Sequence, residues 1–187
     1  MTIHRTLLVL SCFLASSAWA DPLVSDSFAK QAADASLAEV ALGSLAIQKA
    51  ENPAVKAFAQ SMVEDHSQAN SELKTVATQH GITLPTTPPP DAQAAAVALS
   101  QKAGTAFDQA YVAQMVRDHQ QAVALFRTAA MQADISQDLR DFAQKSLPTL
   151  QHHLQEAQQL DAQLAGAAAQ AAPPPLAPVA VSAEVVP

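Results

Sequence analysis

A proline-rich segment near the middle of the chain decides how its helices are connected. It reads Thr83-Leu84-Pro85-Thr86-Thr87-Pro88-Pro89-Pro90, and its four prolines are incompatible with a helix interior. The next residues, 91–102, can form a short helix, so about twenty residues separate the long helices on either side. Because an extended proline-rich chain covers about 3 Å per residue, this connection is long enough to run the length of a helical bundle.

Two helical hairpins are predicted, one on each side of this segment. The first turns at Asn52-Pro53, where Asn52 is a good N-cap and Pro53 suits the first helical position. The second turns at Asp134-Ile135-Ser136. The four long helices are expected to span residues 25–50, 53–80, 105–132 and 136–164. Two hairpins joined by one long crossover make an all-α, ferritin-like four-helix bundle; the alternative is an up-down-up-down bundle with a bulky loop.

Local signals set the expected helix ends. Ser25 or Asp26 can cap the first helix, and Gly81 can end the second. The stretch Thr105-Ala106-Phe107-Asp108 matches a capping box, which assigns Asp108 to the start of the third helix. Pro148 lies inside the fourth helix and is expected to kink it.

The first twenty residues are predicted to be a signal peptide, residues 1–20. They combine a positive start, an apolar run from Leu7 to Ala15 and the small-residue pattern Ala18-Trp19-Ala20, which predicts cleavage after Ala20. The alternative is a lipoprotein signal, because Val9-Leu10-Ser11-Cys12 loosely resembles a lipoprotein cleavage box. Either way, the protein is predicted to be exported, and we expect a periplasmic or secreted location.

The bundle domain is expected to span residues 21–165. The remaining segment, residues 166–187, is rich in alanine and proline and lacks a hydrophobic pattern, so it is predicted to be a disordered tail.

Composition argues against several classes of function. The chain carries 10 Lys and Arg against 17 Asp and Glu, a net charge of −7, and has no basic cluster. Nucleic acid and anionic membrane surfaces are therefore poor partners, and the apolar run is too short to span a membrane stably. Cleavage after Ala20 removes Cys12, the only cysteine, which excludes disulfides and thiolate metal sites. The sequence names no protein partner and is compatible with a homodimer.

One ionisable residue interrupts the apolar stripe of each long helix: Glu39, His66, His119 and His153. In a helical hairpin, two residues lie level when they are equally far from the turn. The midpoint of 39 and 66 falls between 52 and 53, and the midpoint of 119 and 153 is 136, so both fall on the predicted turns. The sequence therefore predicts one polar layer across the bundle.

The chemistry of this layer leaves three alternatives open. A carboxylate and imidazoles are costly in an apolar core unless they are paired or bound to metal. Three histidines and one carboxylate suit Zn, Cu, Ni or Fe, so Glu39, His66, His119 and His153 are the predicted metal ligands. The other readings are a layer that is only hydrogen-bonded and a site for another buried ligand. No catalytic residue is assigned.

Three functions follow from these readings. The leading hypothesis is a non-enzymatic periplasmic protein that binds a metal ion through the layer. The second is a ferritin-like metal-dependent enzyme or metal store, and the third is a structural or envelope-stress protein whose polar layer fixes the helix register. Di-iron chemistry is disfavoured because it needs Glu-x-x-His pairs, whereas Val63 precedes His66 by three residues and Leu150 precedes His153 by three.

Other polar residues fall outside the stripes. Asp65 and Asp118 each precede a core histidine and lie about 100° around the helix, at the bundle edge, where they can act as partners of the layer. His152 is expected to be exposed, with the alternative that it replaces His153 if Pro148 rotates the helix.

Several stretches together resemble the bacterial domain of unknown function 4142 family, which is assigned to the ferritin-like fold. The stretches are Glu39-Val40-Ala41-Leu42-Gly43, Asn52-Pro53-Ala54-Val55-Lys56-Ala57-Phe58-Ala59, Met62-Val63-x-Asp65-His66, Phe107-Asp108-x-x-Tyr111-Val112, His119 and Leu147-Pro148-Thr149-Leu150-x-x-His153-Leu154. The resemblance covers about residues 26–164. It implies an exported four-helix bundle and supplies no reaction. The motif residues carried over by position are Glu39, His66, Asp108, His119, Pro148 and His153.

Export with cleavage is the first testable prediction. We expect intact-mass measurement of protein recovered from the producing cell to show an N-terminus at Asp21, because the small-x-small pattern ends at Ala20. A lipid-modified Cys12 at the N-terminus would contradict it and favour the lipoprotein signal.

Overall fold

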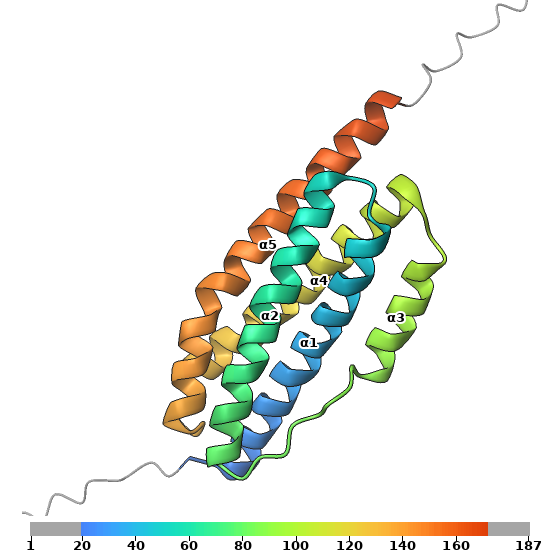
Figure 1. The fold of residues 1–187 in the computed structure, drawn as a ribbon. Coiled ribbons are helices and arrows are strands. Elements are labelled where there is room, and N and C mark those ends of the chain that lie inside the picture. Colours follow the sequence, from blue (N-terminus) through green and yellow to red (C-terminus); the bar gives the residue numbers. More distant parts are fainter. Residues whose placement is uncertain (1–19, 172–187) are drawn as a thin grey trace, which may run out of the picture.

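The computed structural model describes residues 20–171 and is all-helical over this range, as predicted (Figure 1). It contains the helices α1 (Pro22–Lys49), α2 (Pro53–Gln79), α3 (Pro90–Ser100), α4 (Gly104–Met131) and α5 (Gln137–Ala171). The predicted signal peptide, apart from Ala20, and residues 172–187 of the predicted tail lie outside the described residues.

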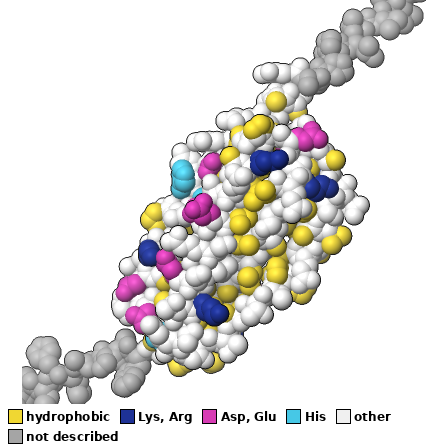
Figure 2. Space-filling model, in the orientation of Figure 1, with side chains coloured by type: hydrophobic (Ala, Val, Ile, Leu, Met, Phe, Trp, Pro, Cys, Tyr) yellow, Lys and Arg dark blue, Asp and Glu magenta, His cyan; other side chains and the backbone are white. Residues whose placement is uncertain are grey.

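The four long helices lie side by side, and the shorter α3 lies on the outside (Figure 1). α1 packs against α2 and α4, and α5 packs against α4 and α2, so each hairpin faces the other along both of its helices. α3 packs mainly against α1 and, to a lesser extent, α4. On the face seen in Figure 2, acidic and basic side chains are interspersed, and Lys and Arg form no cluster there.

The connection between the hairpins runs the length of the bundle. At one end, Asp108 in the second turn of α4 contacts the turn between α1 and α2. At the other end, the turn between α4 and α5 contacts the start of α1, where Asp21 N–H donates to the Asp134 carbonyl at 2.6 Å. Residues 80–103, which include α3, therefore carry the chain from one end of the bundle to the other, as the proline-rich segment predicts.

Helix ends follow the predicted signals at both ends of α2 and depart from them at the start of α1. Asn52 caps α2 by accepting from the Ala54 N–H at 2.8 Å, and Gly81 after α2 has the left-handed φ of 66° that favours glycine. α1 begins three residues earlier than expected, because Asp21 is its N-cap and Pro22 occupies its first helical position. Ser25 is instead buried inside α1 and accepts from the Ser136 N–H at 3.1 Å.

Asp108 does not act as a capping-box residue, which corrects the sequence prediction. α4 starts at Gly104 with Ala103 as its N-cap, and no side chain caps it. The Asp108 carboxylate is 2% exposed and accepts from the backbone N–H groups of Glu51 at 3.2 Å and Asn52 at 2.9 Å. These groups lie where α1 ends and α2 begins, so Asp108 holds the first hairpin turn against α4.

α5 continues past its expected end at Leu164 to Ala171, which corrects the predicted tail boundary. Leu164 is the last buried residue in the described part of the chain, and residues 165–170 are exposed. Alanine has the highest helix propensity, and it dominates this stretch, so the helix continues without packing on anything. Pro148 lies on the exposed side of α5, within the helix as expected; the kink stays a prediction.

The apolar core is divided into two clusters by the polar residues predicted to form a layer. One cluster includes Leu42, Phe58, Met62, Tyr111 and Met115. The other includes Phe28, Leu73, Phe126, Leu139 and Phe142. In each long helix, the members of one cluster precede the ionisable residue and the members of the other follow it.

The Asp108 contact yields a testable prediction. In Asp108→Ala, two partly buried backbone N–H groups lose a charged acceptor, which should lower the free energy of unfolding by about 2–4 kcal/mol. Urea unfolding at pH 7 measures it. Asp161→Ala removes an exposed carboxylate from α5 and should change stability by less than about 0.5 kcal/mol. Equal, small losses in both variants would contradict the assignment.

Candidate metal centre

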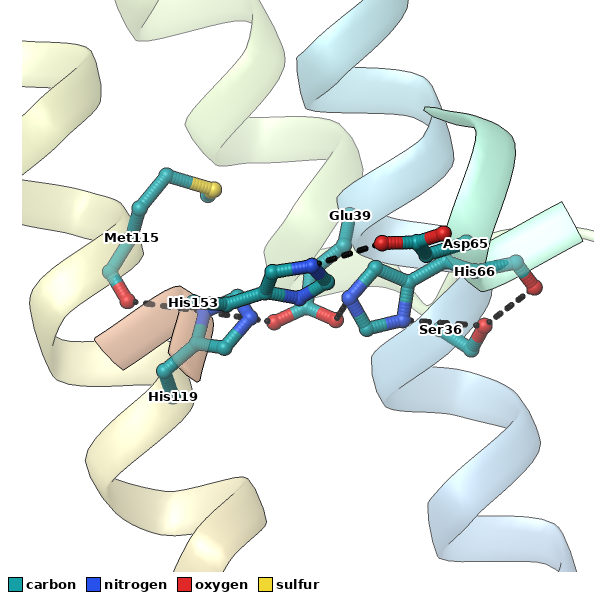
Figure 3. Close-up of polar contacts among 7 residues, drawn as sticks. All are labelled: Ser36, Glu39, Asp65, His66, Met115, His119 and His153. Atoms are coloured by element: carbon teal, nitrogen blue, oxygen red, sulfur yellow. Dashed lines mark hydrogen bonds and ion pairs between the residues drawn. The ribbon is translucent and has the colours of Figure 1, made fainter. Parts of the chain in front are cut away.

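The four residues predicted to form a layer meet at the centre of the bundle, one from each long helix (Figure 3). Glu39 of α1 is 1% exposed, and His66 of α2, His119 of α4 and His153 of α5 are 5% exposed or less. Their side chains turn toward one another, and the ring centroids of the three histidines lie 5.4–5.6 Å apart. The predicted common height of these residues is therefore confirmed.

The Glu39 carboxylate lies between two of the rings. Its Oε2 is 3.0 Å from His66 Nε2, and its Oε1 is 3.2 Å from His119 Nδ1. Both contacts are at ion-pair distance, but neither is aligned as a hydrogen bond, so Glu39 Oε1 and His66 Nε2 are without an aligned partner among residues 20–171. The carboxylate thus lies close to both α2 and α4 without a directed hydrogen bond to either ring.

Each histidine has one ring nitrogen that is held by an oxygen. His119 Nδ1 lies 3.0 Å from the Met115 carbonyl oxygen, which can only accept, so this nitrogen carries a proton. His153 Nε2 lies 2.8 Å from the Asp65 carboxylate, to which it donates in the same way. These two contacts determine the tautomers of His119 and His153.

His66 is held in a similar way by Ser36 of α1. The Ser36 hydroxyl donates to the His66 carbonyl oxygen at 3.0 Å, which leaves Ser36 Oγ free to accept from His66 Nδ1 at 3.4 Å. The remaining nitrogens, His66 Nε2, His119 Nε2 and His153 Nδ1, are buried and have no hydrogen-bond partner in the described part of the chain. When the rings are neutral, each of these nitrogens carries an unshared lone pair.

The charges within the layer are unequal. Burial alone would raise the pKa of Glu39, but His66 and then His119 outweigh it, and the pKa of this carboxyl is lowered. Burial likewise disfavours the charged His66 ring, but the adjacent Glu39 carboxylate outweighs it and raises the pKa of His66. Glu39 and His66 therefore form a buried ion pair.

The other two rings are neutral at pH 7. Burial lowers the pKa of His119 despite the Glu39 charge, and it lowers the pKa of His153 to about 4 despite the contact with Asp65. A neutral imidazole can donate its lone pair to a metal ion, whereas a protonated one cannot. Two of the three rings are thus already in the protonation state that metal binding requires.

The residues present fit a transition-metal ion. His66, His119 and His153 can each offer one nitrogen such that the three nitrogens lie within 4.8 Å of one another. Zinc–nitrogen bonds are about 2.0–2.1 Å long, so a bound ion would draw these atoms slightly inward. A ligating histidine usually donates its other nitrogen to a carboxylate or carbonyl oxygen, as His153 and His119 do here.

Some contacts of the layer were predicted and others were missed. Asp65 lies at the bundle edge and holds His153, as its position beside His66 suggested, whereas Asp118 is bonded by Gln114 on its own helix at 2.8 Å. His152 has 73% of its side chain exposed, so the alternative that it replaces His153 is wrong. Ser36 was missed, although it lies one turn before Glu39 on the same face of α1.

Tyr111 is a further buried polar residue that the sequence analysis quoted only as part of a motif. It is 0% exposed, and its hydroxyl has no hydrogen-bond partner within residues 20–171. Burial, reinforced by the Glu39 charge, raises the pKa of this hydroxyl, so it stays protonated.

The fold and the layer together define a class: an all-helical bundle with a buried cluster of one carboxylate and three imidazoles at its centre. A family model described as "Domain of unknown function (DUF4142)" matches residues 14–160, and the chain belongs to this family. The resemblance seen in the sequence motifs is thereby confirmed.

A comparison with solved structures supports the fold alone. The chain resembles a crystal structure of a DUF305 fragment from Deinococcus radiodurans with a TM-score of 0.67 and 14% sequence identity, covering 78% of this chain and 99% of that one. No curated protein matches the chain. Within residues 20–171, no helix combines the length and the apolar character needed to cross a membrane.

The lowered pKa of His153 predicts a pH dependence of stability in the metal-free protein. Below its ordinary pKa of 6.5 the unfolded chain takes up a proton, whereas the folded ring resists it down to about 4, so stability falls as the pH falls through this window. The lowered pKa of His119 changes stability in the same direction. The raised pKa of His66 acts in the opposite direction, because its contribution to stability is lost only as the pH rises above 6.5.

Replacing the ring tests this dependence. Between pH 7 and pH 5, His153→Gln should lose about 2 kcal/mol less free energy of unfolding than the wild type, measured by urea unfolding with EDTA present. His152→Gln changes the adjacent exposed ring and should lose as much as the wild type. The same loss in all three proteins would show that His153 titrates normally in the folded state.

Proposed function

We propose that this protein is an exported helical-bundle protein that binds one transition-metal ion through His66, His119, His153 and Glu39. One observation carries the proposal: three buried histidines converge, each with one nitrogen held by an oxygen and the other without a hydrogen-bond partner among the described residues. This is the arrangement of a ligand set oriented by its neighbours.

The energetics favour a ligand over a layer that is only hydrogen-bonded. Each buried polar atom without a partner costs about 1–3 kcal/mol, and His119 Nε2 and His153 Nδ1 are two such nitrogens within one layer. A metal ion accepts both lone pairs at once and removes this cost, and it accepts the lone pair of His66 once this ring has released its proton. The competing account is supported by the Glu39–His66 ion pair, which stabilises the layer without any metal.

The donor set restricts the class of ion. Imidazole nitrogens with one carboxylate oxygen suit Zn, Cu, Ni or Fe, whereas Mg and Ca prefer sites made of oxygen ligands. In this proposal the three histidines supply nitrogens, and the Glu39 carboxylate, already 3.0–3.2 Å from two of the rings, supplies the oxygen and offsets one positive charge. Binding requires His66 to release its proton, so affinity should increase with pH.

We further propose that the domain is a ferritin-like four-helix bundle. The two hairpins and the crossover that spans the bundle support this, as does the likeness in fold to the DUF305 fragment. Ferritin-type storage and di-iron chemistry are not proposed, because Val63 and Leu150 stand where Glu-x-x-His pairs need glutamate. Export is proposed from the sequence of residues 1–20 alone.

Metal stoichiometry tests the central proposal. Protein stripped with EDTA and titrated separately with Zn, Cu, Ni and Fe salts should take up one ion per chain of at least one metal. His66→Ala and His119→Ala each remove one ligand and should abolish stoichiometric uptake. His152→Ala, which changes a largely exposed ring, should bind as the wild type does.

Melting curves provide the second readout. At ion concentrations about a hundredfold above the dissociation constant, a bound metal adds about 2.7 kcal/mol, so EDTA should lower the wild-type melting temperature by several degrees and leave His119→Ala unchanged. A wild type that is isolated metal-free, takes up no ion and ignores EDTA would leave the hydrogen-bonded layer as the correct account.

A further inference from the structure

A cavity adjoins one side of the polar layer, and a separate groove between α1, α3 and α4 reaches Glu39 from the outside. The cavity has a volume of about 150 Å³ and reaches the layer at Glu39, His66 and His153. Every other residue that lines it, apart from Asp65, lies on the side of the layer toward the turn between α4 and α5, among or beside the core cluster of Phe28, Leu73 and Phe126. The layer is therefore open toward this end of the bundle.

The opposite side of the layer is densely filled. Phe58, Met62, Tyr111 and Met115 are each 0% exposed and belong to the other core cluster. Met62 and Met115 lie one helical turn before His66 and His119, so they cover the layer from that side. An ion bound by the histidines thus has side chains against one face and free volume against the other.

The cavity extends to the surface between α2 and α5. Its outer wall includes Glu72 and Lys145, which form an ion pair of 2.7 Å between the two helices, and both side chains are at least one-third exposed. Deeper, the wall is mainly apolar, with Ala69 and Leu150 among the lining residues. A small solute has a path from this surface to the layer.

We propose that the metal ion held by the layer keeps an open coordination position toward this cavity, and that a small monovalent anion binds the ion there. The proposal rests on the proposed function. The four proposed ligands fill a tetrahedral set, so the open position is a fifth one, and the cavity beside His66 and His153 leaves room for an exogenous ligand there. Glu39 is the one buried carboxylate of the layer, and Asp65 is 43% exposed and screened by solvent, so the two only partly offset the charge of a divalent ion, and a buried charge is stable only when paired.

The size of the cavity limits the ligand. An apolar cavity of about 150 Å³ holds a molecule as large as benzene, so hydroxide or azide fits with room to spare. Recognition of such a small anion comes from the metal bond, the charge and the volume.

Azide titration of the cobalt-loaded protein tests the inference, because Co(II) has visible absorption bands that change with its coordination. The full chain loaded with Co(II) should show a saturable spectral change at one azide per cobalt. Cobalt content measured after the titration shows that azide has not removed the ion.

Filling the cavity distinguishes this site from any other. Ala69→Leu places a larger side chain in the cavity from α2, and Ser146→Leu does so from α5 if the first variant fails to fold. Either should bind one Co(II) per chain and weaken azide binding at least tenfold. Ala57→Leu, an exposed position on α2, should bind both as the wild type does.

Each other outcome has a separate meaning. A wild type that binds one Co(II) without responding to azide would overturn the open position and leave the metal site intact. Azide binding equal in the wild type and the filled variants would overturn the role of the cavity. A wild type that binds no Co(II), Zn, Cu, Ni or Fe would overturn the proposed function itself.

Discussion

A buried carboxylate is the constraint on which the rest of the structure depends. Glu39 is 1% exposed at the centre of the bundle, where an isolated negative charge is very unfavourable. His66 and His119 lie 3.0 and 3.2 Å from its two oxygens, and they come from two other helices. Sliding one helix by a single turn, about 5.4 Å, would separate these atoms, so the charge fixes the register of the bundle.

The sequence predicts the height of this layer because both hairpins have short turns. Residues equally far from Asn52-Pro53 must lie level, whatever the side-chain packing, and the same holds about Asp134-Ile135-Ser136. It also predicts the crossover, because the prolines before α3 exclude a helix. Contacts between hairpins do not follow from spacing. The spacing does not say which helices are neighbours, and this decides the contacts of Glu39 with His119 and of Asp65 with His153.

Two departures from prediction share one physical cause: a group from a distant part of the chain takes over a side chain that the local sequence assigns to a helix cap. Asp108 fits a capping box, but Glu51 and Asn52 present two N–H groups to it from more than fifty residues away. Ser25 fits an N-cap and instead accepts from Ser136. The extra length of α5 is different. Residues 165–170 are exposed, so alanine's helix propensity, and not packing, accounts for the continuation of the helix over them.

The two sides of the layer differ in what they contribute to stability. Dense packing around Phe58 and Tyr111 holds the helices together, and the polar layer fixes their register. A layer that served register alone would be more stable with its nitrogens partnered and the adjacent volume filled, because unpartnered polar atoms and cavities both cost free energy. Both costs occur at His66 and His153. Proteins tend to tolerate such local losses of stability where they hold a ligand. The occurrence of both costs at one place therefore favours a binding site over a layer that serves register alone.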